Sequence, residues 1–169
     1  DKLKQQISLL IKALIKSEKN YVVIYPNNDS GANLIFSEYS KIQKNKCFRL
    51  IPSMRFEFFL SLLKNANFII GNSSSAIIEA PYFGVSAINV GSRQNNRINS
   101  KNTLNVDFNI QKILSAIKIA NKKKIKKSKN FGKGGSAKLF MKILKKNFFW
   151  DSNTQKYFKD YTRKNASKK

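Results

Sequence analysis

The sequence has 169 residues with 33 Lys or Arg against 9 Asp or Glu, a formal net charge of +24 at pH 7, no histidine and one cysteine, Cys47. This length suits one ordinary domain with a core of its own, and the composition excludes an internal disulfide and a zinc site of the usual ligand types. No signal peptide and no run of about twenty apolar residues is present, so we expect a cytoplasmic protein without a membrane-spanning segment.

The basic charge has two interpretations. A strongly basic face neutralises phosphates, so a non-enzymatic nucleic-acid-binding module is one of them. The lysines, however, are spread through nearly every predicted element beside abundant asparagine and isoleucine, which a compositional bias also produces. Because the sequence lacks the interleaved aromatic and basic platform of single-strand binders, we favour the bias and expect no nucleic-acid partner.

The first third of the chain predicts a helix, a strand and a second helix. Apolar residues recur at helical spacing over 1–16, which predicts a helix that covers a sheet. The continuous apolar run 21–25 predicts a parallel strand buried on both faces, and Pro26 ends it. A polar loop, 27–31, leads into the next helix, which we expect to reach Ile42.

Two more strands are predicted before the middle of the chain. The first is 47–51, whose apolar neighbours also predict a buried structural thiol at Cys47. After it, Ser53 is expected to cap a helix with its apolar face inward. The second strand, 68–70, stops at Gly71.

A run of three serines follows, where the pattern switches from strand to helix. If Ser73, Ser74 and Ser75 begin that helix, unpaired backbone N–H groups and the positive end of the helix dipole face an anion beside small hydroxyls. Glu79 lies about one turn further on, and Gly84 is expected to end the helix. A merely structural turn is the competing interpretation, because serine is a common N-cap and a lone helical glutamate is mostly solvated.

The remaining elements continue the alternation. A strand is predicted at 87–90, a loop then carries Arg93, and a short strand is predicted at 103–107. Asn109 is expected to cap the following helix. A glycine-rich break precedes a last helix at 136–146.

Alternating strands and helices predict an α/β fold, with a three-layer Rossmann-like parallel sheet that carries helices on both faces. Ligands of such sheets collect beyond the carboxyl ends of the strands, where the loops after residues 25, 51, 70 and 90 are expected to meet. We predict one Rossmann-like domain over 1–147 and a basic and aromatic tail over 148–169. The tail either packs against a partner domain or frays.

Three stretches carry a resemblance to a known family. They are 71–97, GNSSSAIIEAPYFGVSAINVGSRQNNR, 25–32, YPNNDSGA, and 131–140, FGKGGSAKLF. Together they resemble UDP-N-acetylglucosamine (UDP-GlcNAc) 2-epimerases, above all the hydrolysing branch that forms N-acetylmannosamine for sialic-acid-type sugars. The resemblance implies the C-terminal half of a two-domain glycosyltransferase-B-like enzyme. It also implies UDP-GlcNAc and UDP as ligands, an N-terminal domain elsewhere in the same enzyme, and a homo-oligomer.

The resemblance assigns roles to matching residues. Ser73 and Ser74 would bind the diphosphate of UDP, with hydroxyls and backbone N–H groups donating to phosphate oxygens. Glu79 would accept hydrogen bonds from the ribose hydroxyls. Arg93 would place a planar charge near the phosphates or the sugar.

Two further residues would line the uridine pocket by the same resemblance. Asn27 follows the first strand. Met54 follows the second strand and would line the pocket through a main-chain contact or by simple packing. On local pattern alone, Asn27 is a turn residue and Met54 an apolar residue at a helix start.

The chemistry of the family is anti elimination of UDP with epimerisation at C2, followed in the hydrolysing branch by addition of water. That scheme needs a base at the C2 proton and an acid near the anomeric oxygen. In the family these groups belong to the N-terminal domain, and a histidine near the domain junction is absent here. We therefore expect no catalytic residue, metal or cofactor in this chain, and no activity from it alone. The non-hydrolysing branch, which returns UDP-ManNAc, is the alternative.

Three positions depart from the family pattern. Ala76 stands where glycine usually follows the serines, Ser86 where proline usually follows the Gly-Val pair, and Asn96 where glycine usually precedes the next arginine. We expect Ala76 to add a methyl group close to the phosphate turn and Asn96 to alter the backbone angles that its loop permits. None of the three removes a proposed ligand residue, but a non-functional copy of the enzyme stays an alternative.

Overall fold

The computed structural model describes residues 2–26, 31–94, 103–122, 125–132, 134–151 and 155. The chain divides into two compact units, Asp1–Phe131 and Gly132–Lys169, and each is described by itself. The domain boundary expected after residue 147 stays a prediction.

The strands of the first unit run parallel in two hydrogen-bonded sheets. One sheet pairs β1 with β2, and the other has the order β3-β4-β5. Their bounds are β1 (Tyr21–Ile24), β2 (Phe48–Ile51), β3 (Phe68–Gly71), β4 (Ser86–Val90) and β5 (Thr103–Val106). The predicted α/β class with parallel strands is therefore confirmed. Among the described residues, the strands form two separate hydrogen-bonded sheets instead of one.

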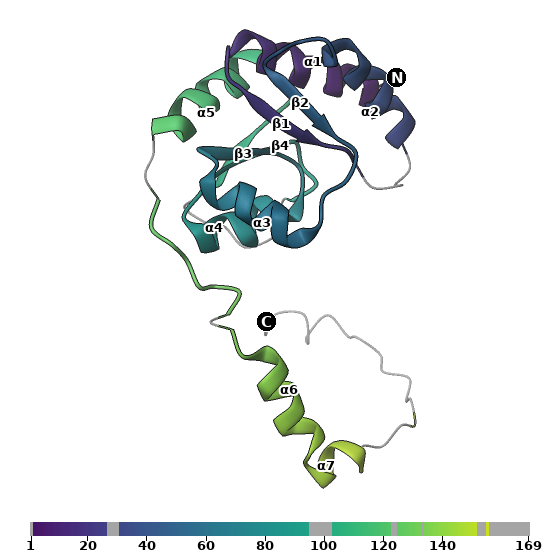
Figure 1. Cartoon of the computed structure of the whole chain (residues 1–169), viewed down its shortest axis with the longest axis vertical. Helices are drawn as coiled ribbons and strands as arrows, with labels where there is room; N and C mark the ends of the chain where they lie inside the picture. Colours follow the sequence, from purple (N-terminus) through teal and green to yellow (C-terminus); the bar gives the residue numbers. More distant parts are fainter. Residues whose placement is uncertain are drawn as a thin grey trace, which may run out of the picture. The chain divides into compact units, whose positions relative to one another are not determined.

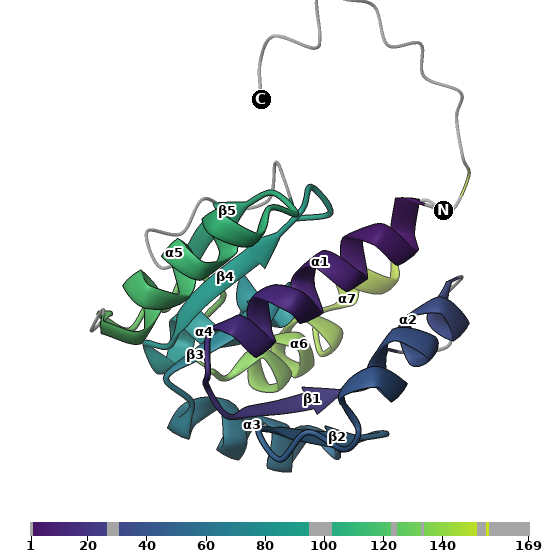
Figure 2. The same ribbon diagram turned by 90° about the horizontal axis from the view of Figure 1, so that it is seen from above.

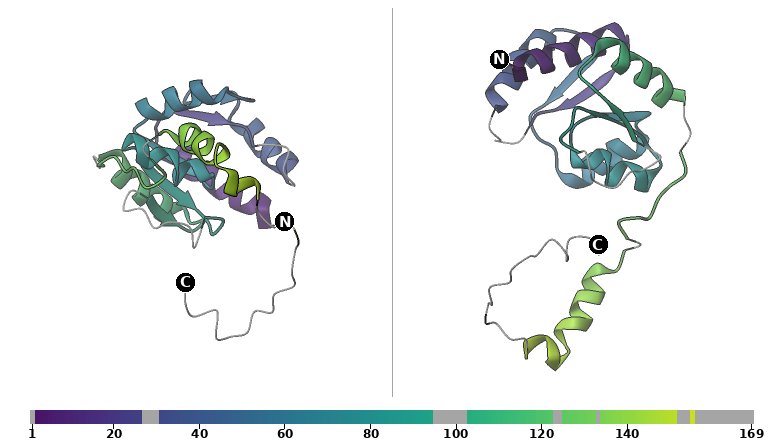
Figure 3. Two further views of the ribbon diagram at one scale, coloured as in Figure 1. Left: turned by 90° about the horizontal axis from the view of Figure 1, so that it is seen from below. Right: turned by 180° about the vertical axis from the view of Figure 1, so that it is seen from behind.

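Helices cover both sides of these strands. Figure 1 shows α1, α2 and α5 on one side and α3 and α4 on the other, and Figure 3 shows the same layers from behind. Seen from above in Figure 2, α1 lies between α5 and α2, and it packs against both. The helices are α1 (Lys2–Lys16), α2 (Ala32–Tyr39), α3 (Phe56–Asn65), α4 (Glu79–Phe83) and α5 (Ile110–Lys122), with 3-10 turns η1 (Ser40–Ile42) and η2 (Ser74–Ala76).

Each helical layer encloses its own apolar core. The larger core packs α1 and α5 against the strands, with Ile88 and Ile113 fully buried at its centre. The smaller core lies beneath α3 and α4 around Leu63 and Ala80. The rings of Tyr21 and Phe68 meet edge to face with centroids 6.2 Å apart, so the larger core is continuous across the two sheets.

Strand β4 is the centre of the three-stranded sheet. All five of its residues are buried, as expected for a parallel strand covered on both faces. It therefore fixes where the loops at its carboxyl end leave the sheet.

The helix after the serines is shorter than the sequence predicts. Ser74 begins a 3-10 turn, and the α-helix α4 begins only at Glu79 and ends at Gly84, whose φ is 75°. Pro81 explains the difference, because a helix begun at the serines would place its ring in the interior and lose the bond to the Ile77 carbonyl. The prediction that the serines begin an α-helix is wrong, so the full dipole of a long helix does not act at this turn.

Three smaller expectations have mixed outcomes. Arg55, not Ser53, occupies the N-cap position of α3, without a side-chain cap bond. Cys47 is half-buried rather than buried, because it lies in the turn before β2, where its N–H is bonded to Asn45 Oδ1 at 3.0 Å. The predicted cap of α5 is confirmed, since Asn109 Oδ1 accepts from the N–H of Lys112 at 3.0 Å.

The second unit contains α6 (Ser136–Leu144) and α7 (Asn147–Trp150), neither of which has a buried residue. Trp150 donates from Nε1 to the Leu144 carbonyl at 2.8 Å, which fixes α7 against the end of α6. None of the described helices has the length and apolar character needed to cross a bilayer.

Candidate functional site

The candidate site lies at the carboxyl ends of β3 and β4. These strands pair in parallel, and Gly71 at the end of β3 stands opposite Asn89 near the end of β4. The serine turn and the loop that carries Arg93 therefore leave the sheet side by side. This is the edge at which ligands of open α/β sheets bind.

The serine turn presents its first hydroxyl to solvent. Ser73 is exposed and extended, and its Oγ accepts a hydrogen bond from the N–H of Ser75 at 3.3 Å. The Ser73 carbonyl accepts from the N–H of Ala76 at 3.2 Å, and Ser74 is half-buried. Since the Ser73 oxygen already serves as an acceptor, its O–H proton is available to donate to an anion.

Glu79 contributes a carboxylate oxygen without a hydrogen-bond partner in the described part of the chain. The residue opens α4, directly after the serine turn, and its Oε2 is buried without a hydrogen-bond partner among the described residues. A buried acceptor in this condition costs about 1 to 3 kcal/mol, and more when it is charged. A ligand that donates a hydroxyl here would remove that cost.

Gln94 joins the two loops, and sequence reasoning missed it. Its side chain is 5% exposed, and Nε2 donates to the Asn72 carbonyl at 2.7 Å across 22 residues of sequence. This bond joins the loop that carries Arg93, which is exposed, to the residue before the serine turn. A glutamine in a polar loop gives no sequence signal, because only the fold shows which carbonyl it reaches.

A polar pair shapes the start of the second loop. Asn89, fully buried in β4, donates from Nδ2 to Asn105 Oδ1 at 2.8 Å and to the Gly91 carbonyl at 3.4 Å. Gly91 has φ 84°, and a Cβ there would lie 2.7 Å from the ring of Phe108. Glycine is therefore required where the chain turns toward Arg93.

The predicted uridine residues are placed in part. Met54 is half-buried and follows β2, and the N–H of Tyr25 donates to the Ile51 carbonyl at 3.0 Å, so the ends of β1 and β2 are adjacent. Asn27 lies outside the described residues. The uridine pocket thus stays a prediction.

The departures from the family pattern have different surroundings. Ala76 is 1% exposed and packs in the apolar core beneath α3 and α4, so its methyl group faces that core and not the phosphate turn. Ser86 is buried at the start of β4. Asn96 lies outside the described residues.

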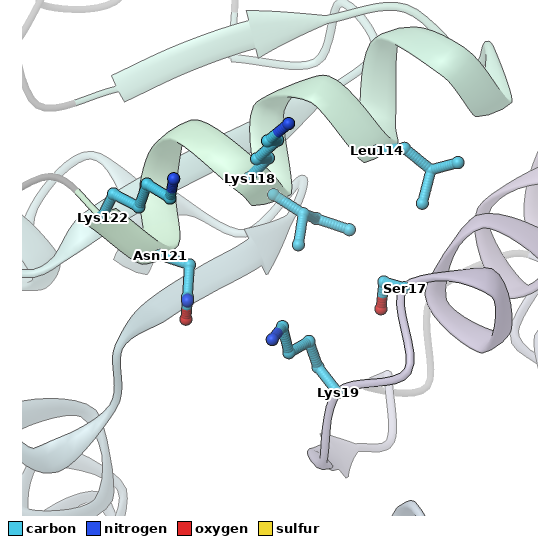
Figure 4. Close-up of a pocket in the computed structure, with 7 residues that line it drawn as sticks. Ser17, Lys19, Leu114, Lys118, Asn121 and Lys122 are labelled. Carbon is cyan, nitrogen blue, oxygen red and sulfur yellow. The ribbon is translucent and has the colours of Figure 1, made fainter.

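A separate cavity of about 280 Å³ lies between α5 and the segment that follows α1 (Figure 4). Lys19 extends across it toward Asn121, whereas Lys118 and Lys122 run alongside α5, so the three ammonium groups do not converge. None of the predicted site residues lines it. In the part of the chain that the structure describes, no group of three His, Cys, Asp or Glu side chains is placed to hold a metal.

Comparison with known proteins identifies the family. The family model described as UDP-N-acetylglucosamine 2-epimerase matches residues 1–145. The chain belongs to the UDP-N-acetylglucosamine 2-epimerase family. The chain is 40% identical over 160 residues to a UDP-N-acetylglucosamine 2-epimerase of Neisseria meningitidis serogroup B, covering 92% of this chain and 42% of that protein.

Other relatives extend the comparison. The chain is 35% identical to a UDP-N,N'-diacetylbacillosamine 2-epimerase (hydrolyzing) of Legionella pneumophila, covering 86% of this chain and 39% of that protein. The crystal structure of Methanocaldococcus jannaschii UDP-GlcNAc 2-epimerase in complex with UDP-GlcNAc and UDP superposes with a TM-score of 0.71 at 22% identity, covering 83% of this chain and 41% of that one. This likeness shows a glycosyltransferase-B-like fold. The chain spans about two fifths of these proteins, as expected for one half of a two-domain enzyme.

Proposed function

We propose that this chain supplies the UDP-binding part of a UDP-GlcNAc 2-epimerase of the hydrolysing branch. The observation that carries the proposal is the buried Oε2 of Glu79, which has no partner among the described residues and belongs to the helix that follows the serine turn. A UDP site needs hydrogen-bond donors to the pyrophosphate beside an acceptor for the ribose hydroxyls, and the serine turn and Glu79 offer both within one short segment of the chain.

Each residue has a distinct part in the proposed site. Ser73 and Ser74 donate hydroxyl and backbone hydrogens to the diphosphate, and Arg93 adds positive charge to the same group. Glu79 accepts from the ribose hydroxyls, which gives its Oε2 the partner that it lacks among the described residues. Met54 and Asn27 complete the uridine side of the pocket.

The relatives support both the ligand and the branch. The M. jannaschii enzyme that shares the fold was solved with UDP-GlcNAc and UDP. The names of the Legionella relative and of a Campylobacter jejuni relative contain the word hydrolyzing. A third relative is an Escherichia coli polysialic acid biosynthesis protein, which agrees with N-acetylmannosamine as the product.

The proposed role of this chain in the reaction is to hold the leaving nucleotide. Elimination transfers negative charge to the β-phosphate of UDP as the bond to the anomeric carbon breaks. Donors preorganised at the serine turn and Arg93 stabilise that charge where it develops. The base at C2 and the acid near the anomeric oxygen belong to the N-terminal domain, so the isolated chain binds UDP without turning over UDP-GlcNAc.

The non-hydrolysing branch is the second candidate, because the name of the Neisseria relative does not specify hydrolysis. Analysis of the products of the complete protein separates the two, since free N-acetylmannosamine appears only in the hydrolysing reaction. A nucleic-acid-binding module instead predicts steeply salt-dependent binding to DNA or RNA. A homo-oligomer stays a prediction of the resemblance, and a cytoplasmic location stays a prediction of the sequence.

Calorimetric titration of the chain with UDP tests the proposal. Glu79→Gln is expected to weaken binding by about 1 to 3 kcal/mol, since the amide replaces a charged acceptor of the ribose hydroxyls. Glu57→Gln is the matched control, because Glu57 is exposed on α3 and should leave the affinity unchanged. Equal affinity in both variants would contradict the site, and absence of UDP binding to the unaltered chain would contradict the function.

A further inference from the structure

We infer that Gln94 is a positioning residue of the proposed UDP site, which fixes the arginine loop to the serine turn. The inference rests on the proposed function. Gln94 touches neither the nucleotide nor the reacting atoms in the proposed site.

The geometry joins the neighbours of two proposed ligands. Gln94 follows Arg93 directly, and Asn72 precedes Ser73 directly. The Nε2 group of Gln94 donates to the Asn72 carbonyl at 2.7 Å. The hydrogen bond therefore holds Gln94, next to Arg93, against Asn72, next to Ser73.

The burial of Gln94 favours a specific role over incidental packing. Glutamine side chains are mostly exposed, and a buried amide is unfavourable unless its polar atoms are bonded. Here the side chain is 5% exposed, and its Oε1 is buried without a partner among the described residues. If position 94 served only to fill space in the fold, leucine would be more stable there than glutamine.

The position of the bond explains what it would do. The β3–β4 ladder ends at the pair Gly71 and Asn89, and beyond that pair both chains leave the sheet. The Gln94–Asn72 bond lies beyond this last pair, where the ladder no longer sets the spacing of the chains. It therefore fixes the spacing of the two backbone segments that carry Arg93 and the serines, which are proposed to bind one diphosphate.

The first test is the affinity of Gln94→Leu for UDP and for uridine, measured by calorimetry. Loss of the donor should weaken UDP binding about tenfold while leaving uridine binding unchanged, because uridine has no phosphate. Gln43→Leu is the matched control, since Gln43 is exposed and away from the site. If Gln94→Leu does not fold, Gln94→Asn replaces it, because it keeps the amide but is one methylene too short.

A double-mutant cycle with Arg93→Ala tests whether Gln94 acts through the arginine. If it positions Arg93, Gln94→Leu should cost less UDP affinity in the Arg93→Ala background than in the unaltered chain. Additive losses would contradict positioning of the arginine by this bond.

Gln94→Glu provides a pH-dependent readout that a packing role would not give. At neutral pH the new carboxylate cannot donate to the Asn72 carbonyl, so UDP binding should be weak. When acid protonates it, the O–H can donate, and the affinity should rise above that of Gln94→Leu at the same pH. If acid only removes the repulsion between the new carboxylate and the diphosphate, the affinity should rise no higher than that of Gln94→Leu. That result would overturn the inference.

The outcomes separate this inference from the proposed function. If the unaltered chain binds UDP and Gln94→Leu binds it equally well, the positioning role is wrong and the UDP site stands. If the unaltered chain does not bind UDP, the proposed function and this inference are both wrong.

Discussion

Asn89 in β4 and Asn105 in β5 are joined by a side-chain hydrogen bond of 2.8 Å beneath the loop that carries Arg93. Asn89 is fully buried, and its Nδ2 also donates to the Gly91 carbonyl at 3.4 Å. The pair therefore connects the central strand, its neighbour and the turn at the edge of the candidate site.

We expect Asn89→Ala to destabilise the fold by about 1 to 3 kcal/mol, because the buried amide contacts are lost and a small void remains. Urea denaturation followed by circular dichroism measures this change. Asn33→Ala, at an exposed position on α2, is the control and should stay within about 0.5 kcal/mol of the unaltered chain. Equal stability of the two variants would show that the Asn89 contacts contribute nothing.

Gly91→Ala should also destabilise the chain. The backbone there has φ 84°, and the new methyl group would lie 2.7 Å from Phe108 Cε2. The left-handed conformation costs a residue with a side chain about 1 kcal/mol, and the contact with the ring adds to it. Thermal unfolding of Gly91→Ala, Phe108→Leu and the double variant should show losses that do not add, because the smaller side chain relieves the clash.

Much of this fold follows from patterns of apolar residues. The continuous apolar runs that become β1 and β4 and the helical spacing in α1 are strong signals of two strands and a helix. Burial on both faces is confirmed for β4, but it is wrong for β1, where Val22 is 44% exposed. The start of α4 was harder to place. Serines commonly begin helices, but Pro81 is tolerated only in the first turn of a helix, so α4 begins at Glu79.

The site was only partly accessible from the sequence. Ser73, Glu79 and Arg93 are marked by their types and by the resemblance, and the structure places their segments at one edge of the sheet. Gln94 could not be found in this way, because its partner is a backbone carbonyl 22 residues away. A contact of this kind depends on the ends of two strands meeting, which no local pattern encodes.

Alkaline pH should destabilise the chain through Tyr39. Burial raises the pKa of the Tyr39 phenol, and the neighbouring Tyr25 phenol raises that pKa further. The unfolded chain then releases this proton at about pH 10, before the folded chain does, so the stabilising contribution is present below about pH 10 and is lost as pH rises through the folded pKa.

We therefore expect Tyr39→Phe to reduce the slope of stability against pH above about pH 10. Burial also raises the pKa of Tyr21, which remains in that variant, so part of the slope should persist. The measurement is urea denaturation at several pH values. Tyr82→Phe, at an exposed position, should keep the full slope, and an identical slope in both variants would contradict the assignment to Tyr39.

Ser74→Ala should weaken binding of UDP but not of uridine. The hydroxyl is proposed to donate to the diphosphate, so its removal should lower the affinity for UDP by about 1 to 3 kcal/mol if the contact is buried. Ser61→Ala, at an exposed position on α3, is the control. Parallel loss of UDP and uridine binding would place Ser74 away from the phosphates.

A crystal structure of the chain with UDP tests the central claim most directly. Our account predicts the diphosphate within hydrogen-bonding distance of Ser73 and Ser74, and a ribose hydroxyl donating to the carboxylate of Glu79. Nucleotide bound elsewhere, such as in the cavity between α5 and the segment that follows α1, without a ribose hydroxyl at Glu79 Oε2, would contradict it.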